Sequence, residues 1–342
     1  FLKKGYLKPM SKNLNINLVK TALVFPGQGS QKLGMLSEFS DFNCFPEVKL
    51  IYQEASDVLN YDLWDLTQKD ELKLNQTQYT QPAILAASCA LFKIFSNPAR
   101  SLDLFSSSDL CVMAGHSLGE YTALVCSGAL KFSDAISLVS LRGRFMQEAV
   151  PEGLGAMAAI LGLEDSKVLE ACDLARESEV VSAVNFNSPG QVVIAGHEMA
   201  VFRAMDFAKQ LGAKRALPLP VSVPSHCELM NPAALRLAEV LKNIDVSSLN
   251  NLIPVIHNVD VLSHQNNSAE IKQALIKQLD QPVQWVKSVN SMIKNYEVSR
   301  VIEIGPGKVL TGLNKRIISE ITTEDLSVEC LSFNGEELIN KI

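Results

Sequence analysis

The sequence lacks the features that define several classes of protein. Its seven cysteines are odd in number, widely spaced and free of any C-x-x-C pair, which argues against a disulfide framework or a structural zinc site. This cysteine usage favours a reducing compartment, so we expect a cytoplasmic protein without a metal. No apolar run approaches the roughly 18 residues of a membrane span. The longest, Pro82 to Phe92, is typical of a buried helix.

Basic clusters are also absent. The net charge is −6, and no Lys/Arg block or interleaving of basic and aromatic residues occurs. We therefore expect neither nucleic acid nor a membrane as a partner. A phosphate-binding loop is missing as well, because the glycine-rich segment 26–31 does not match G-x-x-x-x-G-K-[ST].

What is present indicates a globular protein. The chain has 342 residues, of which 47% are hydrophobic and 20% charged. This length can supply one large domain and a smaller one. We expect residues 1–17, which contain four lysines but no continuous apolar segment, to be a disordered extension or tag.

The motif around which the chain is organised is Gly115-His-Ser-Leu-Gly119. It follows an apolar run, Leu110 to Ala114, and precedes a helical pattern, Glu120 to Cys126. This order of strand, sharp turn and helix is the context of a nucleophile elbow, in which two glycines expose a serine on a strained corner. Ser117 is therefore the candidate nucleophile.

The middle of the chain has a different pattern. Alternating strand and helix periodicities between Gly155 and Ser222 predict the order βαββαβ, which is typical of a ferredoxin-like unit. We predict an α/β fold: a large α/β hydrolase-like domain over 18–152 and 223–342, with this ferredoxin-like subdomain, 153–222, inserted.

A serine nucleophile needs a base, and a histidine is the usual one. The five histidines are His116, His197, His226, His257 and His264. His116 adjoins Ser117 and points away from it, while His197 and His264 lie where capping or solvated residues are expected. His226 follows Pro224-Ser225, in a loop where the chain re-enters the large domain. It is the best candidate, although it comes early for an α/β hydrolase and no acidic third member is evident.

Further polar side chains of interest lie after the first strand and on a later helix. Gln28 is a neutral donor between two glycines at the end of the strand Thr21 to Phe25. Ser133 is expected to cap a helix that runs from Asp134 to about Ala149. Arg142 and Arg144 both lie on that helix, and because residues two apart face different directions, at most one should turn inward.

Six motifs together resemble one family. They are Phe25-Pro-Gly-Gln-Gly-Ser-Gln31, Gly115-His-Ser-Leu-Gly-Glu120, Arg142-Gly, Asn185-Phe-Asn-Ser-Pro-Gly190, Pro224-Ser-His226 and Glu303-Ile-Gly-Pro-Gly307. Their order and spacing resemble the malonyl-CoA:acyl carrier protein transacylases of bacterial type II fatty acid synthesis. The resemblance runs from about Val19 to Leu331 and implies the same fold as predicted above.

The resemblance also implies roles for particular residues. Ser117 would be the acylated nucleophile and His226 its general base and acid, oriented by the backbone carbonyl of Gln278. Gln28 and the backbone N–H of Leu118 would form the oxyanion hole. Arg142 would bind the free malonyl carboxylate. A planar guanidinium suits this role better than a lysine, because it can make two parallel hydrogen bonds to a carboxylate.

The implied reaction is a two-step acyl transfer. Malonyl-CoA, a substrate and not a cofactor, would acylate Ser117, and the phosphopantetheine thiol of acyl carrier protein would then take the malonyl group. The family implies a monomer that needs no cofactor and binds acyl carrier protein transiently. The carrier is expected to be acidic, so we expect a basic patch, for which Lys308, Lys315 and Arg316 are candidates.

Three alternatives stay open on the residues. A trans-acting polyketide acyltransferase would share the fold and the serine–histidine pair but use another acyl unit. A serine thioesterase or hydrolase is disfavoured by Arg142 and the early histidine. A non-catalytic scaffold would be expected to lack Ser117, His226, Gln28 or Arg142, and all four are present.

Overall fold

A computed structural model describes residues 19–98, 109–221, 223–247, 253–264, 267–321 and 327–334. The predicted extension, residues 1–17, lies outside the described residues. None of the helices in the described ranges is long and apolar enough to cross a membrane. All seven cysteines lie in the described residues, and none of them forms a disulfide.

The centre of the fold is a five-stranded sheet with the order β7-β2-β1-β8-β9. Its strands are β1 (Thr21–Phe25), β2 (Leu110–Gly115), β7 (Val255–Ile256), β8 (Arg300–Ile304) and β9 (Glu329–Phe333). Every neighbouring pair is parallel. All five residues of β1 are buried, as expected for a parallel strand covered on both faces. The carboxyl ends of the strands therefore meet at one edge, where the loops gather.

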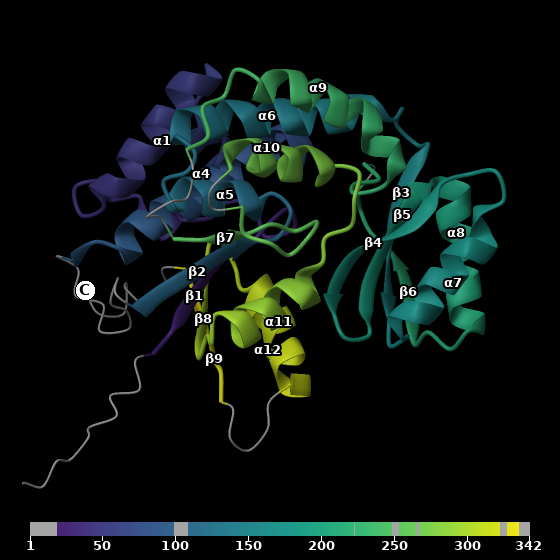
Figure 1. The fold of residues 1–342 in the computed structure, drawn as a ribbon. Coiled ribbons are helices and arrows are strands. Elements are labelled where there is room, and N and C mark those ends of the chain that lie inside the picture. Colours follow the sequence, from purple (N-terminus) through teal and green to yellow (C-terminus); the bar gives the residue numbers. More distant parts are fainter. Residues whose placement is uncertain are drawn as a thin grey trace, which may run out of the picture.

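Helices cover both faces of this sheet (Figure 1). Leu23 and Phe25 of β1 belong to the core shared with the first group of helices, whereas Ala22 and Val24 belong to the core shared with the second. The first group comprises α1 (Pro46–Leu59), α2 (Leu63–Lys69), α3 (Glu71–Leu74), α4 (Thr77–Phe95), α5 (Gly119–Cys126), α6 (Phe132–Ala149), α9 (Asn231–Leu241) and α10 (Ser268–Lys277). The second comprises α11 (Trp285–Asn295) and α12 (Val309–Ile321).

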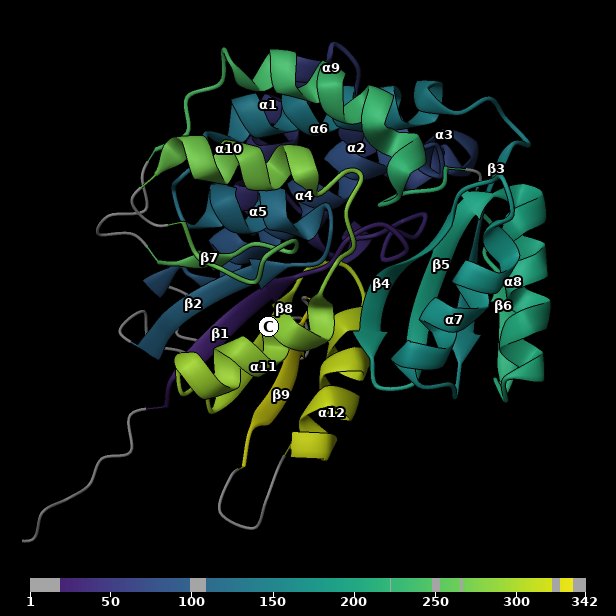
Figure 2. The ribbon, with the colours of Figure 1, turned by 45° about the vertical axis from the view of Figure 1, so that its right-hand side comes forward.

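A separate antiparallel sheet has the order β4-β5-β3-β6. It is built from β3 (Gly155–Leu161), β4 (Val181–Ser188), β5 (Gln191–His197) and β6 (Arg215–Pro218), with α7 (Asp165–Arg176) and α8 (Glu198–Gln210) between them in the chain. Both helices pack on one face of this sheet (Figure 2). The predicted element order βαββαβ is confirmed.

β4 links the antiparallel sheet to the rest of the molecule. The N–H of Phe186 donates to the carbonyl of Val283 at 3.0 Å, and the N–H of Val283 donates to the carbonyl of Val184 at 2.8 Å. Val283 lies two residues before the start of α11, so these backbone bonds join the antiparallel sheet to the segment that leads into a helix packed on the main sheet. They hold the segment between β3 and β6 beside the carboxyl edge of the parallel strands (Figure 2).

One local prediction is wrong and some helices were not predicted. The helix expected to begin after Ser133 begins at Phe132, with Lys131 in extended conformation at the N-cap and no side-chain cap. Ser133 therefore lies inside the first turn. The short helices α2 and α3 and the amphipathic α11 were not predicted. α2 and α3 are too short to show a clear helical period. In α11 the helical spacing of Trp285, Val289 and Met292 was an available signal.

Candidate active site

The turn between β2 and α5 places Ser117 at the carboxyl edge of the parallel sheet. Ser117 has a φ of 52°, in the left-handed region that few non-glycine residues adopt. A Cβ on Gly115 would lie 1.8 Å from the backbone carbon of Gly119, and one on Gly119 would lie 2.0 Å from the carbonyl oxygen of Phe25. Only glycine fits at both positions. The predicted elbow is thus present, with its strain held by close backbone packing.

His226 lies directly against the serine. Its Nε2 is 2.8 Å from Ser117 Oγ, and its Nδ1 is 2.6 Å from the backbone carbonyl of Gln278. A carbonyl oxygen only accepts, so Nδ1 carries the proton and donates it, which leaves Nε2 as the acceptor facing the serine hydroxyl. The backbone of His226 has a φ of 66° and donates its N–H to the carbonyl of Leu279 at 2.9 Å. The histidine is therefore fixed from both sides.

The surroundings of His226 favour its neutral form. Burial, with the nearby Arg142 cation as the second cause, lowers the pKa of this imidazole to about 3, although the Gln278 carbonyl acts in the opposite direction. His226 is only 3% exposed. In the absence of a bound anion, His226 is therefore unprotonated at neutral pH and able to accept a proton.

Arg142 is a buried cation beside the serine. Its side chain is 1% exposed, and it donates to Gln81 Oε1 at 2.9 Å, to Gln278 Oε1 at 2.9 Å and to Ser117 Oγ at 3.2 Å. Within the part of the chain that the structure describes, no carboxylate bonds to the guanidinium, and its Nε has no hydrogen-bond partner. Burial lowers the pKa of Arg142. A buried guanidinium with neutral partners suits an anionic ligand.

The packing of α6 on α4 explains the position of the Arg142 side chain. A Cβ on Gly143 would lie 2.6 Å from the carbonyl oxygen of Thr77, so the glycine lets the start of α4 approach α6 closely. This approach brings Gln81 of α4 within reach of Arg142. Arg144 is half exposed and lies 3.9 Å from Glu148, which confirms that only one of the two arginines turns inward.

The two predicted oxyanion-hole residues also lie at the serine. Gln28 and Leu118 line the same cavity as Ser117, His226 and Arg142. Gln28 is exposed, and its Nε2 is 3.5 Å from Thr77 Oγ1, so this amide is weakly held. Leu118 occupies the N-cap of α5, where backbone N–H groups have no partner within the helix. Both N–H groups are thus placed to donate hydrogen bonds to an oxygen in the cavity.

The cavity over these residues has a volume of about 130 Å³. Its other lining residues come from α6, from the antiparallel sheet and from the segment that leads back from it: Met146, Met157, Asn185, Leu219, Val221, Val223 and Ser225, together with His116 of the elbow. Apolar side chains therefore surround a small polar centre, as in most small-molecule sites.

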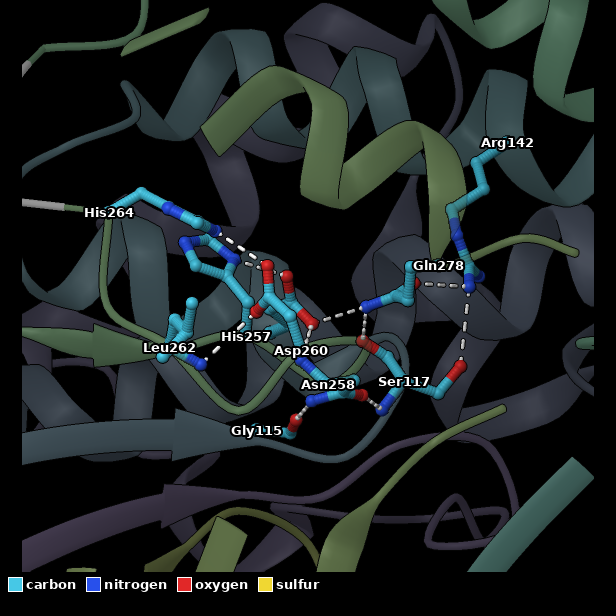
Figure 3. Close-up of polar contacts among 10 residues, drawn as sticks. Gly115, Ser117, Arg142, His257, Asn258, Asp260, Leu262, His264 and Gln278 are labelled. Atoms are coloured by element: carbon cyan, nitrogen blue, oxygen red, sulfur yellow. Dashed lines mark hydrogen bonds and ion pairs between the residues drawn. The ribbon is translucent and has the colours of Figure 1, made fainter. Parts of the chain in front are cut away.

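The structure adds residues that the sequence did not indicate. Asn258 accepts from the Ser117 N–H through Oδ1 at 2.7 Å and donates through Nδ2 to the Gly115 carbonyl at 2.7 Å, so one amide braces both sides of the elbow (Figure 3). Asn258 follows β7, a two-residue strand parallel to β2. The polar pair His257-Asn258 after a short apolar segment was the available signal, but so short a strand is hard to recognise.

The remaining histidines have other partners. His116 Nε2 lies 2.8 Å from Asn187 Oδ1, and His197 Nδ1 accepts from the Val180 N–H at 2.9 Å. His264 contacts Asp260 and Glu270 near the surface. None of these three contacts the serine hydroxyl, so within the described residues His226 is the one histidine that bonds to it.

A strained serine, a histidine at hydrogen-bond distance and donors aimed at the same cavity are the parts of an acyl-transfer enzyme with a serine nucleophile. Comparisons with known proteins agree with this class. The model of the acyl transferase domain family matches residues 22–330.

More specific relatives cover nearly the whole chain. It is 53% identical over 311 residues to the malonyl CoA-acyl carrier protein transacylase of Escherichia coli K12, a match that covers 91% of this chain and 96% of that protein. It is similar to the crystal structure of an acyl carrier protein S-malonyltransferase from Vibrio cholerae, with 51% identity, a TM-score of 0.84 and coverage of 94% and 99%. It is also similar, at 48% identity and a TM-score of 0.83, to a malonyl-transacylase in complex with its type II PKS acyl-carrier protein, with coverage of 94% and 98%. The chain belongs to the malonyl CoA-acyl carrier protein transacylases of the acyl transferase domain family.

Proposed function

We propose that this chain transfers the malonyl group of malonyl-CoA to the phosphopantetheine thiol of an acyl carrier protein, through a malonyl ester on Ser117, and so supplies fatty acid elongation. The names of its relatives support the reaction. The observation that favours a malonyl substrate is Arg142, a buried guanidinium 3.2 Å from Ser117 Oγ whose direct partners are all neutral. An acyl group with a free carboxylate would pair with it.

In the first half-reaction, Ser117 Oγ attacks the thioester carbonyl while its proton passes to His226 Nε2. The C–O bond forms, a tetrahedral oxyanion develops, and the C–S bond then breaks. His226 returns the proton to the leaving thiolate of CoA. Nδ1 of His226 stays bonded to the Gln278 carbonyl throughout, so the ring keeps its orientation without a buried acidic partner.

Gln28 and the Leu118 N–H are proposed to stabilise the oxyanion. Each donor aimed at the forming oxygen is worth roughly 10²–10³ in rate. In the second half-reaction the carrier thiol gives its proton to His226 Nε2 and attacks the same ester. Ser117 recovers the proton when its C–O bond breaks, and the site returns to its starting state.

This chemistry needs no metal or redox cofactor, because malonyl-CoA supplies the activated acyl group as substrate. None of the seven cysteines forms a disulfide, which supports a reducing compartment, and we place the reaction in the cytoplasm.

A second acceptor has one observation in its favour. The relative solved with a type II PKS acyl-carrier protein is 48% identical to this chain. A carrier of polyketide synthesis is therefore the alternative acceptor, with the same acylation step and the same residues.

The test is intact mass after brief mixing with malonyl-CoA or acetyl-CoA, on wild type, Ser117→Ala and Arg142→Ala. We expect a malonyl adduct on wild type and none on Ser117→Ala. Arg142→Ala should form the malonyl adduct roughly 10- to 100-fold more slowly, because hydrogen bonds to a charged group are lost, and should discriminate poorly against acetyl-CoA.

Two other outcomes would contradict the proposal. Steady release of CoA from wild type without an adduct would indicate a hydrolase. No adduct and no release would indicate a scaffold.

A further inference from the structure

Glu120 is a fully buried carboxylate in the first turn of α5. Its Oε1 lies 2.7 Å from His257 Nδ1. Its Oε2 accepts from the Asn258 N–H at 3.0 Å and from Gln278 Nε2 at 2.8 Å. A buried carboxylate persists only when its oxygens are bonded, and here nitrogen groups from three other residues surround it. Glu120 thus acts as an acceptor for its neighbours.

The contacts of Glu120 determine how the Gln278 amide is oriented. Nε2 of Gln278 donates to the Ser117 carbonyl at 2.9 Å (Figure 3). The same nitrogen donates to Glu120 Oε2. The amide oxygen must then face the other way, where it accepts from Arg142 Nη2 at 2.9 Å. A flipped amide would direct an NH₂ group at the guanidinium, which has only donors, and its oxygen at two acceptors. Only one orientation satisfies all three contacts.

This arrangement also separates two opposite charges. A carboxylate in direct contact with Arg142 would compete with the substrate for the guanidinium. Here one neutral amide lies between Arg142 and Glu120, so the cation is held in place while its direct partners stay neutral. Gln81 holds the other terminal nitrogen of Arg142 at 2.9 Å. The cation is fixed on two sides.

We propose that Glu120 is a positioning residue for substrate selection: it fixes the Gln278 amide, which holds the Arg142 guanidinium toward the acyl group on Ser117. The inference rests on the proposed function. It gives Gln278 a second role, because its side chain orients the arginine while its backbone carbonyl orients His226.

The experiment compares kcat/KM for malonyl-CoA and for acetyl-CoA in wild type and Glu120→Gln. The glutamine is close in size but weakens the acceptor that faces the Gln278 amide, because it removes the charge and turns one of the two oxygens into a donor. We expect the ratio of the two kcat/KM values to fall roughly 10- to 100-fold, the effect of a misplaced charge-assisted bond.

Glu303 provides a matched control. It is also fully buried, and it accepts from the Leu310 N–H at 3.0 Å and from the N–H and hydroxyl of Thr311 at 2.7 Å each. Glu303→Gln disturbs a comparable carboxylate whose bonds go to α12 and not to the arginine. Its selectivity ratio should match that of wild type.

Gln278→Met tests the same contact without changing a buried charge, since it removes the amide and keeps the backbone carbonyl. It should lower the selectivity ratio. Adding Glu120→Gln to Gln278→Met should lower the ratio no further, because both changes break the same chain of hydrogen bonds.

An unchanged ratio in folded Gln278→Met overturns the proposal, whether or not Glu120→Gln folds. The proposal is also overturned if Glu120→Gln lowers kcat/KM equally for malonyl-CoA and acetyl-CoA. It is likewise overturned if the two substitutions lower the selectivity ratio additively in the double variant.

Failure of this inference is distinguishable from failure of the proposed function. If wild type forms no malonyl adduct, the proposed function is wrong. If wild type forms the adduct and both variants keep its selectivity, only the role of Glu120 is wrong.

Discussion

At the scale of single residues, the site depends on burial of groups that would otherwise be charged or hydrated. His226 is kept neutral by its surroundings, with burial as the main cause and the Arg142 cation as the second. A substrate carboxylate bound to Arg142 would offset part of that cation's field. The base is therefore free in the resting enzyme and should become more basic once the malonyl group is bound.

This predicts the pH dependence of acylation. The free-enzyme base should stay unprotonated down to a pH of about 3, so kcat/KM for malonyl-CoA should change little between pH 7 and pH 5. A histidine with its ordinary pKa of about 6.5 would lose more than tenfold over that range. Rapid-quench mass spectrometry across this range measures the profile.

The comparison variant is Arg142→Ala. Removing the cation should raise the pKa of His226, so the fall of kcat/KM in acid should begin closer to neutral pH. An acid limb near pH 6.5 in wild type would contradict the assignment.

Burial of neutral His226 also predicts a loss of stability in acid. Its pKa is lower in the folded chain than in the unfolded chain, so below pH 6.5 the unfolded state binds more protons and is favoured. The free energy of unfolding should fall by about 2 kcal/mol from this group between pH 7 and pH 5. Urea unfolding at both pH values, for wild type and His226→Gln, isolates this part of the change. If the variant loses as much stability as wild type, the prediction is wrong.

At the scale of elements, the elbow depends on backbone contacts that only glycine allows. β2, α5 and the end of β1 approach so closely that a methyl group at Gly115 or Gly119 would overlap backbone atoms. The strained φ of Ser117 is held by the same contacts and by the Asn258 amide. A strained backbone conformation of this kind persists only where the surrounding contacts fix it.

We expect Gly115→Ala to destabilise the chain by several kcal/mol and to abolish the malonyl adduct, because backbone cannot move aside as a side chain can. Gly312→Ala in α12 is the matched control, since a Cβ there meets no atom within 4 Å. It should stabilise the chain by about 0.5–1 kcal/mol. Thermal unfolding and intact mass measure both effects, and a fully active Gly115→Ala would refute the packing argument.

At the scale of the whole molecule, the carboxyl edge of the parallel sheet faces the segment that holds the antiparallel sheet, and the cavity lies between them. The loop after β8 belongs to the same region. A Cβ on Gly305 would lie 2.5 Å from the Pro26 side chain, next to the loop of Gln28. A carrier protein that delivers a thiol to Ser117 must approach this region.

The candidate basic patch follows that loop. Lys308, Lys315 and Arg316 are exposed, and Arg316 donates to Gln191 Oε1 at 2.6 Å. Reversing all three charges should raise the KM for acyl carrier protein, with the larger effect at low salt, and leave the KM for malonyl-CoA unchanged. Steady-state kinetics at two ionic strengths test this. Equal effects on both substrates would exclude a docking role.

The sequence by itself determined the nucleophile motif, the α/β class and the βαββαβ order, because these depend on short-range patterns of glycine and apolar residues. It also indicated His226 as the best candidate base among the five histidines, because His226 lies in a loop where the chain re-enters the large domain. The resemblance implied that the Gln278 carbonyl orients His226, and the structure has that contact. Only the tertiary structure decided that Gln81, Gln278 and Ser117 surround Arg142. The Glu120, His257 and Asn258 contacts were likewise absent from the prediction. Several of these contacts join residues more than a hundred positions apart in the sequence. Parallel strands bring such residues together at one edge of the sheet, and they do so through long crossover connections. No local sequence pattern specifies how those connections place one strand beside another.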